Sequence, residues 1–149
     1  MSNTQLGQYI HKGMQAIATL EIANEAMEIS NTFKSDLSSL AASIQNTHLI
    51  AGIANYFSIN PKQESEIRMN KMLTAVAMVA MDLDLSENVL HKVMEFCHKT
   101  PNINIDDEMV HVSCDDMDTY KLMCLKQKIH LAIVALKECI STYKLVKDD

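Results

Sequence analysis

The chain is poor in the residues that punctuate β structure. It has three glycines and two prolines in 149 residues, and it has no tryptophan. All-β folds need turn residues about every 8–12 positions, which this chain cannot supply. Alanine, leucine and eleven methionines are abundant instead, and these residues lose little rotamer freedom in a helix. The composition therefore predicts an all-α protein.

Arginine is almost missing as well. Arg68 is the only one, and 19 acidic residues against 13 basic ones give a net charge of −6. Recognition of phosphates and bases depends on arginine and on a basic surface, so the composition argues against nucleic-acid binding. An acidic inhibitor that mimics nucleic acid stays open as an alternative function, because Asp and Glu residues cluster at 106–118.

The sequence offers neither a long hydrophobic run nor a secretory signal. Its longest apolar run, 75–81, is far too short to cross a bilayer. The first ten residues lack the basic region and the apolar core of a signal peptide. Cys124 and Cys139 are about 22 Å apart on one predicted helix, too far for a disulfide. We therefore predict reduced cysteines, a cytoplasmic location and no membrane partner.

Residues 37–61 contain no Asp, Glu, Lys or Arg in 25 positions. A surface helix carries charge on its wet face, so this segment is expected to be covered by protein. Two interpretations stay open: the cover is the rest of the chain, or it is a protein partner or a second copy. The second interpretation assigns the contact to six apolar side chains, Leu37, Leu40, Ile44, Leu49, Ile53 and Phe57.

Apolar residues recur at helical spacing along most of the chain. The stripe that begins at Leu6 and the stripe that begins at Phe33 are half a turn out of phase. Either the chain breaks near 30–32, which we favour, or one long helix carries two stripes. We predict a single-domain bundle (1–149) of about five helices, at 5–30, 32–57, 61–83, 86–99 and 116–146. A short extended or β-hairpin excursion is expected at 101–115.

The most metal-like pattern lies in the predicted helix 86–99. His91, Glu95 and His98 would lie within about 60° of one another on a helix, where imidazole and carboxylate could bind zinc or iron. Glu95 and His98 have the spacing of di-iron bundles, which require further inward-facing glutamates. His111 is the remaining candidate ligand. The other interpretation is a solvated helix face, and a metal-dependent helical-bundle enzyme is therefore only an alternative function.

The C-terminal part of the chain is rich in lysine. Between 119 and 147 one acid, Glu138, stands against six lysines, Lys121, Lys126, Lys128, Lys137, Lys144 and Lys147. Two interpretations stay open here as well: a solvated face whose lysine stems lie over the core, or a local site for an anionic ligand.

No catalytic motif accompanies these features. The three glycines are too scattered for a phosphate-binding loop, and there is no nucleophile elbow. The sequence therefore favours a non-enzymatic, helical protein-interaction module, such as an adaptor, inhibitor, chaperone or assembly subunit. It would bind a partner or itself through the uncharged helix, and no cofactor is predicted.

Overall fold

The computed structural model describes residues 3–46, 48–57, 61–83, 88–103 and 114–147. These residues are mostly helical, which confirms the predicted all-α bundle, and they include one small parallel sheet. The elements, in chain order, are α1 (Asn3–Thr19), β1 (Glu28–Ser30), α2 (Asn31–Asn46), α3 (Leu49–Ala54), α4 (Glu64–Met81), α5 (Val89–Cys97), the 3₁₀ turn η1 (Cys114–Asp116), α7 (Thr119–Ile140) and β2 (Lys144–Val146).

The first helix is shorter than its stripe predicted. The expected helix 5–30 ends at Thr19, because Glu21 takes the left-handed conformation with φ of 54°. The Ile22 N–H then donates to the Ile17 carbonyl at 3.1 Å, which closes the helix in a Schellman-type turn. Met27, which continues the helical spacing of the stripe that begins at Leu6, is 54% exposed. The predicted break between the first two helices is confirmed.

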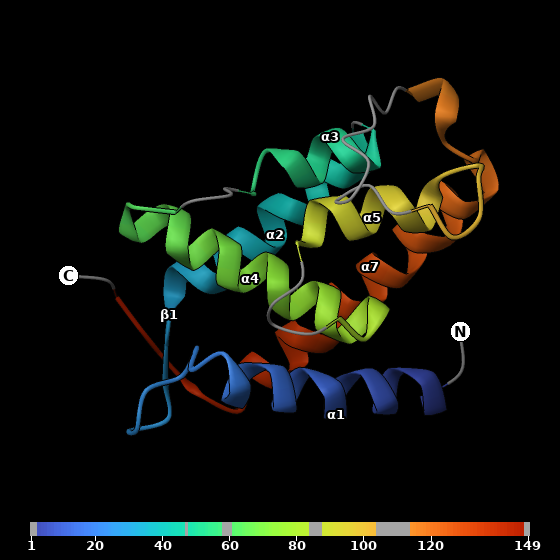
Figure 1. The fold of residues 1–149 in the computed structure, drawn as a ribbon. Helices are drawn as coiled ribbons and strands as arrows, with labels where there is room; N and C mark the ends of the chain where they lie inside the picture. The colour runs from blue at the N-terminus through green and yellow to red at the C-terminus, as the bar shows by residue number, and fades with distance from the viewer. Residues whose placement is uncertain (1–2, 47, 58–60, 84–87, 104–113, 148–149) are drawn as a thin grey trace.

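The segment after α1 forms a strand instead of more helix. The Asn24 side chain accepts hydrogen bonds from the backbone of Ala26 and Glu28, at 3.0 and 2.9 Å, and turns the chain. β1 then pairs in parallel with β2, with Ile29 opposite Leu145. The predicted helix 116–146 accordingly ends at Ile140. Figure 1 shows this pairing at the left, where the C-terminal strand crosses β1.

The predicted helix 32–57 is divided into α2 and α3. His48 begins α3 by accepting a hydrogen bond on Nδ1 from the Ile50 N–H at 3.2 Å. Gly52 lets the short helix lie against α2, since a Cβ at this position would stand 3.3 Å from the Ile44 backbone. The neutral segment therefore folds back on itself as two packed helices.

The next two helices lie within their predicted ranges. α4 begins at Glu64 rather than 61, and the Glu66 carboxylate accepts from the Gln63 N–H at 3.3 Å. α5 begins at Val89 rather than 86, with Asn88 as the N-cap that accepts from the His91 N–H at 3.0 Å. Most of the predicted excursion at 101–115 lies outside the described residues.

The core forms where α1, α4 and α7 meet, with α2 packed on α4 and α7. α4 crosses the front of the molecule, while α1 lies below it and α7 runs behind (Figure 1). α1 and α7 approach closely at Gly13, where a Cβ would stand 2.9 Å from the Cys139 Sγ. That thiol donates a hydrogen bond to the Ile10 carbonyl at 3.2 Å. The first and last helices are thus packed together.

Candidate functional site

The side chains predicted to bind a partner lie mostly inside the chain. Leu37, Leu40, Ile44, Leu49 and Ile53 are buried, and Phe57 is half-buried. The protein's own helices therefore cover the apolar side of the neutral segment, but its other side, which includes Ser39, Ala42 and Ala51, is exposed, so the expectation of cover on most sides was wrong there. Docking of a partner on these six residues stays a prediction, and it would require the bundle to open.

The predicted metal ligands do not converge in the described part of the chain. α5 ends at Cys97, and His98 takes an extended conformation because its strand-like backbone pairs with Met117. The His98 ring is buried, and its Nδ1 accepts from the Thr100 N–H at 3.0 Å. Glu95 pairs with Lys92 at 3.2 Å. Among the described residues no group of three His, Cys, Asp or Glu side chains could hold a metal ion, and His111 lies outside them.

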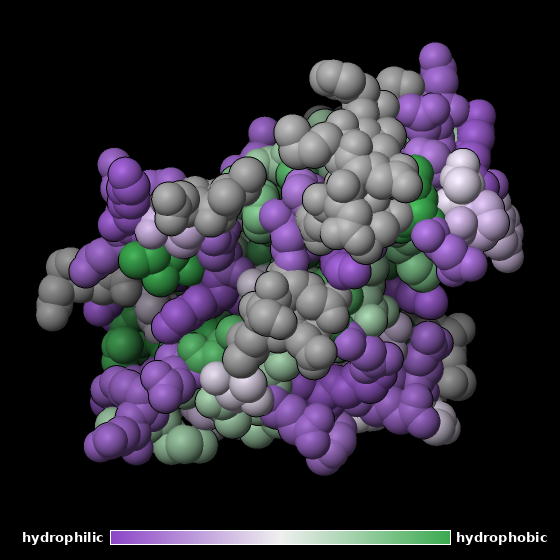
Figure 2. All heavy atoms as spheres, in the orientation of Figure 1, coloured by the Kyte–Doolittle hydropathy of each residue, from purple (hydrophilic) through white to green (hydrophobic). Residues whose placement is uncertain are grey.

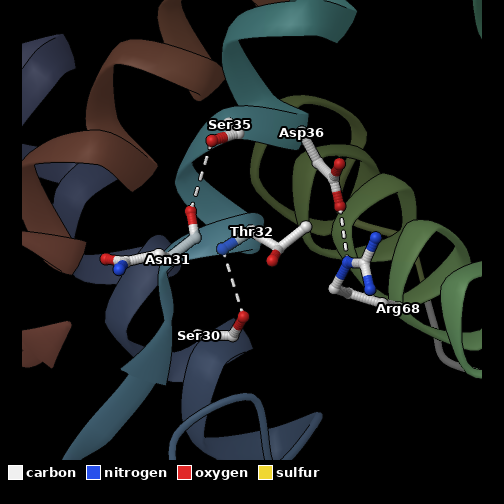
Figure 3. Close-up of polar contacts among 6 residues, drawn as sticks. All are labelled: Ser30, Asn31, Thr32, Ser35, Asp36 and Arg68. Atoms are coloured by element: carbon white, nitrogen blue, oxygen red, sulfur yellow. Dashed lines mark hydrogen bonds and ion pairs between the residues drawn. The ribbon is translucent and has the colours of Figure 1, made fainter. Parts of the chain in front are cut away.

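An ion pair joins α2 to α4. The Arg68 Nε donates to the Asp36 Oδ2 at 2.8 Å, and Asp36 is only 8% exposed (Figure 3). Nearby, the Ser30 Oγ accepts from the Thr32 N–H at 3.1 Å in the first turn of α2. The only arginine of the chain therefore has a structural role that composition did not reveal.

A small cavity adjoins this ion pair. It has a volume of about 220 Å³, an apolar wall that includes Phe33 and Ile67, and a rim that carries Glu21, Arg68 and Lys71 as well as Glu64. Figure 2 shows hydrophobic surface on this side, over the first turns of α4 and beside the C-terminal strand. Ligand sites usually enclose about 300–1,000 Å³. This cavity is below that range, and its rim holds equal numbers of acids and bases.

The most exposed apolar face of the described residues belongs to α7. Tyr120 is 75% exposed, Met123 57% and Val134 48%. Together with Gln127 these side chains lie within an arc of about 60° on the helix, and we call these four residues the α7 face. It is opposite to the stripe of Leu125, Ile129 and Ile133 that α7 buries in the core.

A groove runs beside the α7 face. Its volume is about 530 Å³, within the usual range of binding sites, and Gln5 of α1 closes one side of it. The α7 side chains along the groove are Cys124, Gln127, Lys128, His130, Leu131 and Val134. Burial, and then the charge of Lys126, hold the pKa of His130 below its ordinary value, so this imidazole is neutral at neutral pH.

The exposed side chains of α1 are mostly polar and uncharged. Gln5, Gln8, His11 and Gln15 are exposed, and no acidic residue occurs in the first turn of the helix. Beyond the groove, the Lys128 Nζ lies 5.5 Å from the centre of the half-exposed Phe96 ring. Beside the α7 face, the groove therefore has the neutral Gln5 of α1 on one side and, next to Lys128, the aromatic ring of Phe96 on α5.

We expect Cys97, Cys124 and Cys139 to differ in reactivity. Burial raises the pKa of the Cys97 thiol to about 12, and it raises the pKa of Cys139 as well. The thiolate is the reactive form, so both should resist alkylation of the folded protein at about pH 8. Cys124, on the groove, is only half-buried and should react. Peptide mass spectrometry after iodoacetamide treatment, with and without denaturant, measures this; labelling of Cys97 in the folded protein would contradict the packing.

Comparison with known proteins gives no assignment: no family model, no characterised protein and no solved structure matches this chain. Among the described residues no helix is both long and apolar enough to cross a bilayer. The surface chemistry of the molecule therefore provides the evidence on function.

Proposed function

We propose that this protein is a non-enzymatic interaction module that binds a protein partner through the α7 face and the adjoining groove. The observation that carries the proposal is the exposure of Tyr120, Met123 and Val134 on one side of one helix. Large apolar side chains gathered on one face, with a polar rim, are typical of protein-binding surfaces.

The free energies of burial and of association require that the partner contact more than α7. Tyr120, Met123 and Val134 are already partly buried, so covering what remains exposed contributes about 3–5 kcal/mol, given about 1.5–3 kcal/mol for a fully exposed side chain. Association costs about 4–15 kcal/mol in lost freedom of motion. A stable complex therefore needs further contacts, and Gln5 of α1 on the groove and the Phe96 ring next to Lys128 could provide them.

Site-specific photo-crosslinking tests this function. A benzophenone amino acid at Met123 should give a discrete crosslinked species in a lysate of cells that produce the protein. The same probe at Ser39, an exposed position on α2, serves as the control and should give none. Val134→Asp should abolish the species formed from position 123, because it places a charge in the proposed contact. Equal crosslinking from both positions, or none from Met123, would overturn the proposal.

A further inference from the structure

Lysines flank the α7 face on both sides. At 100° per residue, Lys126 and Lys137 lie about 80–100° to one side of Gln127, and Lys121 and Lys128 lie about 100–120° to the other. Glu138, the only acidic residue within Thr119–Ile140, is exposed and lies one turn beyond Val134 on the same side of the helix as the α7 face. This local excess of positive charge contrasts with the net charge of −6 of the whole chain.

From this arrangement we infer, resting on the proposed function, that the partner segment is an amphipathic α-helix with acidic residues on both sides of its apolar stripe. Such a helix would place its apolar side chains against Tyr120, Met123 and Val134. Its carboxylates would then lie near the lysines on either side. Apolar helix faces with anchors at three- and four-residue spacing commonly bind grooves in this way.

The length of the face sets the size of the partner segment. Tyr120 and Val134 are about 21 Å apart along the helix axis, at about 1.5 Å per residue. A partner helix of about 14–18 residues would span this distance, with three or four apolar anchors. The groove beside Gln5 has room for the side chains at one edge of that helix.

A second copy of the chain fits this face poorly. If two α7 faces met, the lysines of one copy would oppose those of the other, and like charges at close range weaken an interface. Lys121 is in part engaged within the chain, since its Nζ donates to the His98 carbonyl at 3.0 Å. Lys126, Lys128 and Lys137 would still face one another, and no acid other than Glu138 on α7 would compensate.

An anionic membrane also fits poorly. Membrane-surface helices bury a broad apolar face into a planar interface, whereas this face borders a groove whose far wall is polar α1. Its exposed apolar anchors are few, and the negative charge of the whole chain opposes approach to anionic lipids. The geometry and charge therefore favour a helical partner.

Fluorescence anisotropy with synthetic peptides tests the inference. The probe is a labelled helical peptide of about 18 residues with a leucine stripe flanked by glutamates. The control peptide has the same leucines with lysines in place of the glutamates. The glutamate peptide should bind, and its Kd should rise about tenfold or more between about 0.05 and about 0.5 M NaCl, since salt screens exposed charges. The lysine peptide should bind at least about tenfold more weakly.

Variants assign the binding to specific side chains. Lys126→Glu combined with Lys137→Glu should weaken the binding of the glutamate peptide about tenfold, since each exposed ion pair contributes up to about 1 kcal/mol. Lys34→Glu combined with Lys62→Glu makes the same change in charge at exposed positions elsewhere and should change the affinity less than about threefold. Circular dichroism should show that all of these variants are folded.

Each contrary result has a distinct meaning. Equal affinity for both peptides would overturn the acidic partner. So would binding to phosphatidylserine vesicles in preference to the glutamate peptide, or self-association through α7 in sedimentation. If crosslinking from Met123 succeeds while the glutamate peptide fails to bind, the partner class is wrong and the interaction function stands. If neither succeeds, both proposals fail.

Discussion

Replacing Ile44 by alanine should lower the free energy of unfolding by about 2–5 kcal/mol, the usual cost of truncating a large buried side chain. Ile44 is fully buried in α2, and it packs against Gly52 of α3. The substitution removes apolar contacts and leaves a cavity that the two rigid helices cannot close. Chemical denaturation followed by circular dichroism measures the change.

Ser38→Ala is the matched control for this substitution. Ser38 lies on the exposed side of the same helix, and its replacement should change the stability by less than about 0.5 kcal/mol. A variant Ile44→Ala as stable as the original protein would show that this side chain is not in the core. The neutral segment would then not be buried as described, and the prediction that a partner docks on Ile44 would be supported again.

Replacing Gly13 by valine should destabilise the protein by about 3 kcal/mol, at the upper end of the usual cost of over-packing. Even a single Cβ at this position would stand 2.9 Å from the Cys139 Sγ and 3.3 Å from the Leu136 Cδ2. The additional methyl groups of valine require α1 and α7 to separate. That separation would also weaken the hydrogen bond from the Cys139 thiol to the Ile10 carbonyl. Thermal and chemical denaturation would both report the loss.

The same substitution at Gly7 isolates the packing effect. Apart from the chain neighbours and the backbone of α1 itself, no atom lies within 4 Å of the position that a Cβ would take at Gly7, so valine meets open space there. Valine is slightly better than glycine in a helix, and Gly7→Val should therefore leave the stability within about 0.5 kcal/mol of the original. If valine lowered the stability equally at Gly7 and at Gly13, the close approach of α1 to α7 at Gly13 would not be the cause of the loss.

The helical class followed from composition, but the helix ends did not. The stripe through Leu20 and Met27 suggested that the first helix continued to residue 30. The left-handed turn at Glu21 and the pairing of β1 with β2 end it earlier instead. Pairing between segments more than 100 residues apart leaves no local signal in a stripe of apolar residues, so this error could not be avoided from periodicity.

The candidate sites also depended on contacts between distant segments that the sequence pattern does not show. His91, Glu95 and His98 have a ligand-like spacing only if the helix continues through His98, and the bridge to Met117 ends it at Cys97. The α7 face was missed although Tyr120, Met123 and Val134 have helical spacing. α7 is apolar on several sides, and only the packing of α1, α2 and α4 decides which side stays outside. The lysine excess was the one signal in the sequence that pointed to this helix.

α1 packs against α7, and β1 pairs with β2. The fold therefore cannot form completely until α7 and β2 have been synthesised. α7 and β2 are made long after α1 and β1, so the side of α1 that packs against α7 waits uncovered while about 120 further residues are made. Premature termination before α7 would thus leave a nascent product with an apolar helix unprotected, a species that chaperones and proteases recognise.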